Sequence, residues 1–392
     1  MPKTAFFRVG FTGFGAYKDV NSSEADNTDG PMVLITGNRD TMKKIAMLLT
    51  LVVLTSVLGR AQQQLATLNH SDSISVYYGM DALKSALDAA TNGDIITLSS
   101  GVFSSPSEIT KAITLRGAGA WQVEGGGNIT VLNDETTLDV PEDSLHHLTI
   151  EGINFPKNVY LENIYGASFW KCNFKVLRLS SVCYVYNTGY YNCIIQSYYN
   201  SPLYYRDNID ENTQYVNSVI LGWTYSDKPA SFINCIVKQD PATACMNSRT
   251  FTNCILFGGY AGNNTPDNNY QTSFNSAFIN TVSYSANGLY KNTSANNLWN
   301  FIGMSTVFKT FDGTLDNGYN FELQDSIATQ CLGNDGTQIG IYGGPVPFDP
   351  RVNNPMIKKI NVARQSTADG KLAVDIEVVS DEHADTLDSE LE

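Results

Sequence analysis

One short pattern of apolar and polar positions recurs through the middle of the chain. Each copy reads aromatic, variable, usually Asn, then a small residue, and most copies continue with an apolar pair such as Ile194-Ile195. The copies follow one another at roughly 17 to 27 residues, which is the spacing of solenoid repeats. This repetition predicts parallel strands stacked in register, one copy per coil. The copies are Phe169–Cys172, Tyr190–Cys193, Tyr215–Ser218, Phe232–Cys235, Phe251–Cys254 and Phe278–Thr281.

In-register stacking assigns a structural role to each position of the repeat. The aromatic residues should form a ladder of rings, and the small residues should point into the coil, where volume is limited. We expect the cysteines of this position to be buried free thiols, because small apolar side chains suit such a place. The recurring asparagines are interpreted as structural, with amides that bond between coils and satisfy a bend. They are Asn192, Asn217, Asn234, Asn253 and Asn280.

The pattern changes at both ends of the repeat region. Residues 81–90 predict a short amphipathic helix, because Leu83, Ala86, Leu87 and Ala90 share one helical face. Such a helix would cap the first coil. Beyond residue 350, two alternating segments separated by an Asp-Gly turn predict a small β-hairpin within 351–380. Residues 381–392 form an acidic tail, for which we expect no fixed structure.

The start of the repeat region carries a second pattern, in Gly93, Asp94, Ile96, Leu98, Gly101, Phe103, Leu115 and Gly117. In these residues it resembles the opening of bacterial pectin lyase-like β-helix proteins. Residues 319–344 are similar to the terminal coil of secreted β-helix repeat proteins from Gram-negative bacteria, with Ser326-Ile327 in place of their usual Ser-Pro. The resemblance implies an all-β fold, a right-handed parallel β-helix over 74–350 with an N-terminal capping helix and a small C-terminal hairpin extension. Many unrelated functions share this scaffold.

A segment before the repeats is typical of an export signal. Residues 42–61 begin with Met-Lys-Lys, continue with the apolar run 45–58 and end in a small-residue site, which predicts cleavage after Ala61. The alternative is a buried core helix. Because a signal normally begins at its own Met, we interpret residues 1–41 as an over-extended N-terminus. The mature protein is therefore expected in the periplasm, on the outer surface or secreted, without a transmembrane segment.

Charge and cysteine content narrow the expected partners. The chain holds 25 Lys and Arg against 39 Asp and Glu, a net charge of -14, so nucleic acid is excluded as an expected partner. Its seven cysteines form no Cys-x-x-Cys pair and lie in no Cys/His grouping, so we predict no metal and no cofactor. We expect a monomer. His146 and His147 could act as a base or as metal ligands, but a solvated turn is favoured.

The richest chemistry of the sequence lies in the loop 197–212. Asp207 with Asp210 or Glu211 is the candidate acid pair, and Arg206 is a candidate anion contact. Aromatic rings around the loop could stack on sugars, or they could simply pack against neighbouring coils. These candidate sugar contacts are Tyr198, Tyr199, Tyr204, Tyr205, Trp223 and Tyr225.

Two functions fit these observations. The favoured one is a secreted or cell-surface β-helix that binds a polysaccharide or a cell-surface glycan without catalysis. The alternative is a polysaccharide lyase or glycoside hydrolase of the pectin lyase-like fold with an atypical site, which rests on fold analogy and on the loop carboxylates. Convergence of those carboxylates with a basic residue in an open groove would favour the enzyme.

Overall fold

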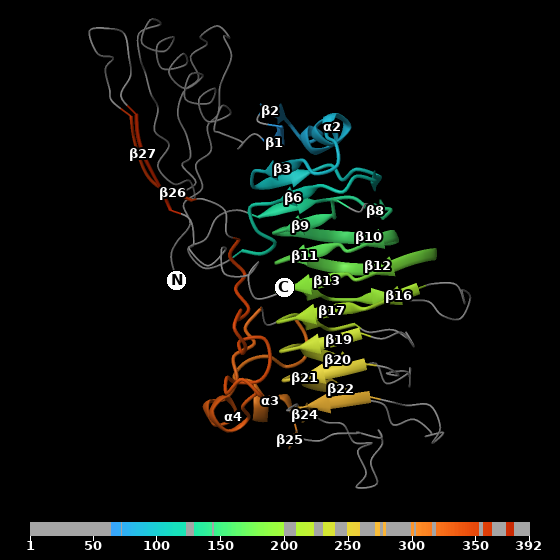
Figure 1. The fold of residues 1–392 in the computed structure, drawn as a ribbon. Coiled ribbons are helices and arrows are strands. Elements are labelled where there is room, and N and C mark those ends of the chain that lie inside the picture. The colour runs from blue at the N-terminus through green and yellow to red at the C-terminus, as the bar shows by residue number, and fades with distance from the viewer. Residues whose placement is uncertain are drawn as a thin grey trace, which may run out of the picture. The chain divides into compact units, whose positions relative to one another are not determined.

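The computed structural model describes residues 64–71, 73–122, 129–142, 145–199, 209–222, 230–239, 249–258, 271–274, 277–279, 299–301, 303–315, 319–352, 356–362 and 374–379. Most of these residues build a parallel β-solenoid, in which strands far apart in the sequence stack one above the next (Figure 1). The prediction of stacked parallel strands is confirmed. No described helix is long and apolar enough to cross a membrane.

The first sheet, sheet A, contains 11 strands within the described residues. All its pairs are parallel except those that β1 makes with β2 and with β3. The strands in spatial order are β2 (Ser73–Tyr78), β1 (Leu65–His70), β3 (Ile95–Leu98), β6 (Thr114–Arg116), β9 (Thr149–Glu151), β11 (Ser168–Trp170), β13 (Gly189–Tyr191), β17 (Thr213–Val216), β19 (Ala230–Ile233), β21 (Arg249–Thr252) and β23 (Gln271–Phe274).

The second sheet, sheet B, follows sheet A around each coil. Its main path runs through β25 (Trp299–Phe301), β24 (Ala277–Ile279), β22 (Ile255–Gly258), β20 (Ile236–Gln239), β18 (Val219–Ile220), β14 (Ile194–Ile195), β12 (Asn173–Tyr186), β10 (Ile153–Tyr165), β7 (Thr130–Leu132) and β4 (Gly101–Phe103). The long strands β10 and β12 continue onto a third face. There they pair with β5 (Glu108–Ile109), β8 (Thr136–Val140), β15 (Tyr198–Tyr199) and β16 (Ile209–Glu211), either directly or through β8.

A ladder of stacked rings fills the interior behind sheet A. Neighbouring rings have centroids 4.6 to 5.0 Å apart and lie within 13° of parallel. The ladder consists of Phe169, Tyr190, Tyr215, Phe232 and Phe251, all buried. The predicted sixth member is wrong: Phe251 pairs with Ser273, whereas Phe278 lies opposite Leu256 in sheet B. The last copy of the repeat therefore follows a different register, although its local sequence matches.

The asparagines form the corner between sheets A and B. Asn192, Asn217, Asn234 and Asn253 are buried and have φ between 46° and 56°. This left-handed conformation suits Asn among the non-glycine residues, so the predicted structural role at a bend is confirmed. Asn280 lies outside the described residues. Lys171 takes the same place on the coil above, with φ 52°.

The small residues that follow the corner point inward, as predicted. Cys172, Cys193, Cys235 and Cys254 are fully buried and reduced. Each thiol lies near backbone carbonyl oxygens at the bend. For example, the Cys235 Sγ is 3.2 Å from the carbonyl oxygen of Tyr215 on the neighbouring coil. Burial raises the pKa values of Cys172 and Cys235 well above the ordinary range, so these thiols stay protonated.

The corner amides do not bond mainly to one another, which corrects the sequence prediction. Those of Asn192, Asn217 and Asn253 bond instead to residues 331–352, which we call the strap. Asn217 Nδ2 donates to the carbonyls of Ile341 and Gly343 at 2.8 and 2.7 Å, and Asn192 Oδ1 accepts from the Asp349 N–H at 2.8 Å. Asn253 exchanges hydrogen bonds with Asn334, and the Lys171 ammonium donates to the Arg351 carbonyl at 2.7 Å.

The strap runs from the region of α3 (Met304–Val307) and α4 (Asp325–Gln330) back along the stack of corners (Figure 1). Its last described residue, Val352, packs closely on Gly152. A Cβ added to Gly152 would lie 2.3 Å from the Val352 Cγ1. Residues 319–344 contribute no strand to sheets A and B, so the expected terminal coil is replaced by α4 and the beginning of this strap.

The strap closes a second core on the outer side of sheet B, which we call the outer core. Ile194, Val219, Ile236 and Ile255 occupy one outward column of that sheet, and all are buried. The strap residues that pack in the same cluster are Ile339, Ile341 and Phe348. The partner residues of the apolar pairs, such as Ile195 and Val237, belong to the interior of the coil.

Near the N-terminus, α2 (Ala82–Ala89) buries its apolar residues against the interior core. Asp94 lies in the following turn, where its carboxylate accepts a hydrogen bond from the Thr91 N–H and contacts His70 Nδ1 at 2.9 Å. At the other end of the chain, β26 (Met356–Val362) and β27 (Val374–Val379) form an antiparallel pair.

Candidate functional site: an uncharged groove on sheet A

The outer face of sheet A carries two columns of side chains in register. The polar column places Ser168, Gly189, Gln214, Ser231 and Thr250 opposite one another on successive strands. Alternation along each strand explains this outward position, because the neighbouring aromatic residue points into the coil. Successive members are therefore spaced by about 4.8 Å, the distance between hydrogen-bonded strands.

The second column contains an aromatic pair. Trp170 and Tyr191 are in register, with ring centroids 4.1 Å apart and an interplanar angle of 15°. The Tyr191 ring lies over Gly189, where an added Cβ would meet its Cε2 at 2.3 Å. Gly189 is thus required beneath the ring. Burial raises the pKa of Tyr191 above its ordinary value, so the hydroxyl stays neutral and can donate a hydrogen bond at neutral pH.

A groove of about 510 Å³ lies beside this pair. That volume falls within the range of about 300–1,000 Å³ that small-ligand sites occupy. Asn187 and Asn212 form one rim, with positive φ values and a hydrogen bond of 3.1 Å from Asn212 Nδ2 to Asn187 Oδ1. The remaining lining residues are Thr188, Gly189, Tyr191, Thr213, Gln214, Ala230, Ser231 and Thr250, so no lining residue is charged.

This arrangement suits a neutral, amphipathic ligand. Aromatic faces stack on apolar surfaces, and hydroxyl and amide groups both donate and accept hydrogen bonds. A sugar ring presents apolar C–H faces and a rim of hydroxyls, so it matches an aromatic pair beside a polar column. A charged ligand would lose hydration without gaining an ionic partner among the lining residues.

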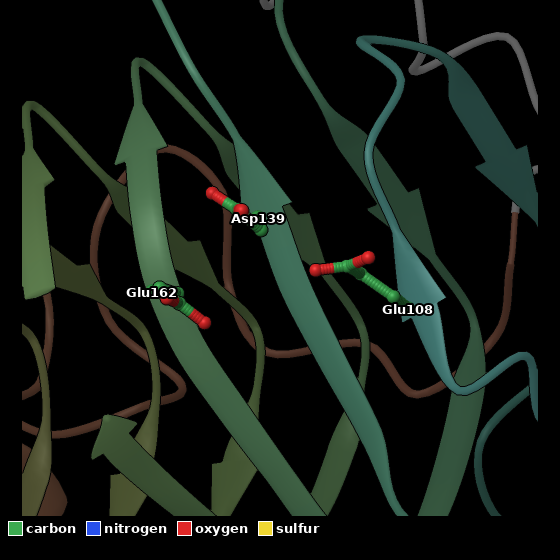
Figure 2. Close-up of side chains that lie close together, drawn as sticks. All are labelled: Glu108, Asp139 and Glu162. Atoms are coloured by element: carbon green, nitrogen blue, oxygen red, sulfur yellow. The ribbon is translucent and has the colours of Figure 1, made fainter. Parts of the chain in front are cut away.

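A separate acidic cluster lies on the third face (Figure 2). Glu108 of β5, Asp139 of β8 and Glu162 of β10 bring one carboxylate oxygen each within 4.8 Å of one another. The pairing of β10 is irregular at this point, between Leu161 and Asn163, and such bulges re-aim side chains. Asn163 Nδ2 donates to Asp139 Oδ1 at 2.8 Å.

Carboxylates so grouped could ligate a hard divalent cation through oxygen. All three residues are exposed or half-exposed, and exposed acidic groups commonly gather without an ion. The cluster comes from three different coils, so no local sequence spacing marks it. The sequence does not single out these three residues, which form the described group that could hold a metal ion.

The candidate residues predicted from the sequence are mostly not placed. Asp207, Arg206, Tyr204, Tyr205, Trp223 and Tyr225 lie outside the described residues. The backbones of Tyr198 and Tyr199 form β15, opposite Leu177 and Arg178 on the third face. Asp210 and Glu211 lie in β16, directly before Asn212 at the groove rim, and their side chains are not described. Whether these residues converge on one site stays a prediction.

The groove residues were missed because the sequence interpretation treated the second position of each repeat as variable. Strand alternation carries the missing signal. If Phe169 and Tyr190 point inward, then Trp170 and Tyr191 must point outward from adjacent coils. His146 and His147 are both exposed, in agreement with the expected solvated turn.

Comparison with known proteins does not name the function. No protein-family model, curated protein or solved structure matches the chain.

Proposed function

We propose that the protein is a secreted or surface-exposed solenoid that binds a neutral polysaccharide without catalysis, and that the groove on sheet A is the binding site. The observation that carries the proposal is the aromatic pair, Trp170 on Tyr191, next to an uncharged polar groove. The polar column adds hydroxyl or amide groups on several consecutive coils. An extended chain of sugars could contact them in succession.

The experiment is a binding titration of soluble neutral and acidic polysaccharides by affinity electrophoresis and calorimetry. Trp170→Ala and Tyr191→Ala should each weaken binding of the preferred glycan about tenfold or more, because stacked aromatic anchors dominate such contacts. Tyr184→Ala is the matched control, since Tyr184 is an exposed tyrosine on β12. Equal loss in all three variants, or a preference for acidic glycans, would contradict the assignment.

The same samples address the catalytic alternative. Reducing-end and unsaturated-product assays detect hydrolase and lyase turnover respectively. Turnover that Asp207→Ala abolishes would establish the enzyme and refute a purely binding role. Absence of both binding and turnover across the panel would reject the sheet A groove as a glycan site.

We also propose the finer features of the fold and the export route. They comprise a right-handed coil of the pectin lyase-like type, α2 as its cap, the C-terminal hairpin extension and cleavage after Ala61. The buried apolar face of α2 supports the capping role. N-terminal sequencing of the protein recovered from outside the cytoplasm tests the cleavage site. A start at residue 62 is expected, and retention of residues 42–61 would contradict it.

A further inference from the structure

Strand β2 ends sheet A and leaves one side of its backbone unpaired among the described residues. The order of the sheet begins β2-β1-β3, so β2 has β1 as its single described neighbour. Its sequence, SISVYY, contains no charge, proline or glycine. Natural edge strands are usually protected by such residues, because an unpaired edge accepts strands from other chains. This strand lacks that protection.

The pairing with β1 shows which backbone groups face the open side. The Gly79 N–H donates to the Gln64 carbonyl at 2.9 Å, and the register continues in antiparallel fashion along β2. Hydrogen-bonded and non-hydrogen-bonded positions alternate in such a pair. The odd-numbered residues of β2 therefore bond to β1. Ile74, Val76 and Tyr78 direct their N–H and C=O groups to the open edge.

The same three residues expose apolar side chains. Ile74 is 71% exposed, Val76 41% and Tyr78 61%, and as alternate residues they share one face of the sheet. Met80, 52% exposed, follows directly. An unpaired backbone and an apolar row thus coincide at one place.

We propose that β2 pairs with β2 of a second copy of this chain. The two strands would run antiparallel about a two-fold axis at Val76, and the two A sheets would become one continuous sheet. In this register Val76 faces Val76 of the partner subunit, and Ile74 faces Tyr78 of the partner subunit. All three outward-facing residues then exchange hydrogen bonds, and the contact closes on itself. The sequence alone predicted a monomer.

The uncharged sequence of β2 allows a second copy as the occupant, and the exposed area sets how strong the contact is. Two chains of net charge -14 repel each other, so close approach requires an uncharged strip, which β2 supplies. If the roughly 150–250 Å² of an aromatic side chain is taken as an upper value for each, the four partly exposed side chains offer on the order of 400 Å² per copy. The total is below the ~1,200 Å² of stable complexes, which predicts a weak, reversible dimer.

The test is register-specific cross-linking of the purified protein. The six described cysteines are reduced and buried, and the unsubstituted protein measures any background from Cys245. Val76→Cys should give a covalent dimer on mild oxidation, because facing Cα atoms in a hydrogen-bonded pair lie about 5.5 Å apart, within disulfide range. Ile74→Cys should not, since its counterpart across the axis is Tyr78. Equal cross-linking at both positions would indicate random collision and overturn the proposal.

Sedimentation over a range of concentrations gives an independent result without cross-linking. The unsubstituted protein should show a monomer–dimer equilibrium, and Val76→Lys should weaken it at least tenfold by placing like charges at the axis. Val102→Lys is the matched control, an exposed valine of the edge strand β4 in sheet B. A monomer at every concentration would overturn the proposal. A second outcome would also overturn it. If the introduced thiol of monomeric Val76→Cys is protected from thiol reagents, and if removal of residues 353–392 ends that protection, then the chain's own C-terminus occupies the edge.

Discussion

The outer faces of sheets A and B differ in what covers them. Both sheets surround one interior core, but the outward column of sheet B is apolar and covered by the strap. The outer face of sheet A keeps polar and half-buried side chains beside an open groove. One solenoid can thus cover one outer face for stability and leave another open.

Removal of the strap should have the largest effect. Truncation after Gln330 takes away Ile339, Ile341 and Phe348, which are buried. At about 1.5–3 kcal/mol for each buried side chain, the loss approaches the entire stability of an ordinary domain. We expect the truncated protein to aggregate or to lose its fixed tertiary packing. Loss of near-ultraviolet circular dichroism and binding of a hydrophobic dye would show this. Truncation after Val352 is the matched control, since it retains the strap and should melt within a few degrees of the full chain.

A charge introduced on each outer face gives a direct contrast. Ile236→Asp puts an unpaired carboxylate into the outer core and should lower the free energy of unfolding by about 4 kcal/mol or more. Ser231→Asp, on the neighbouring strand of sheet A, should change it by less than about 0.5 kcal/mol. Urea unfolding measures both. Strong destabilisation by Ser231→Asp would show that the sheet A face is also covered.

The corner asparagines should differ according to their contact with the strap. Asn217→Ala loses two hydrogen bonds to strap carbonyls and places alanine at φ 46°, so we expect a cost of about 3 kcal/mol. Asn212→Ala, at an exposed corner with φ 58°, loses one exposed hydrogen bond and should cost about 1–2 kcal/mol. Equal costs in urea unfolding would mean that left-handed strain, rather than the strap, determines the effect.

The smallest expected effect concerns Asp94. Burial raises the pKa of this carboxyl, but hydrogen bonds from Thr91 and His70 lower it more, and the net pKa lies below its ordinary value. A pKa lower in the folded state stabilises the protein above about pH 4, and that stability is lost as the pH falls through the folded value. Asp94→Asn should therefore lower Tm by on the order of 2 °C at pH 7, and this difference should shrink as the pH is lowered below about 4. A difference that stays constant as the pH falls would contradict this.

Much of the fold could be predicted because the coil repeats its own sequence. Like residues stack on like, so a single phrase identifies the Phe232–Phe251 contact, the buried thiols and the left-handed corners. The repeat fails at Phe278, where an identical local phrase lies in the other sheet. Local sequence sets a strand's alternation, but only neighbouring coils set its register.

The strap and the groove were harder to foresee. Asn217 and its strap partners are separated by 124 and 126 residues, and such pairings leave no periodic trace. One signal was present, because consecutive buried residues such as Ile236-Val237 indicate a strand covered on both faces. The groove depends on outward positions that vary from coil to coil, so the repeat itself does not mark them.

The strap also alters how the stack should come apart. A stack of coils with contacts only between neighbours can unzip from either end, one layer at a time. A tether that bonds to Lys171, directly after the central strand β11 of sheet A, and to Asn253, directly after β21 near the far end, joins layers that are not neighbours, so these coils cannot separate independently of the strap. Unfolding under pulling force should therefore begin with one high-force rupture rather than a series of small steps. Folding should finish slowly, because this long-range closure forms after the layers beneath it.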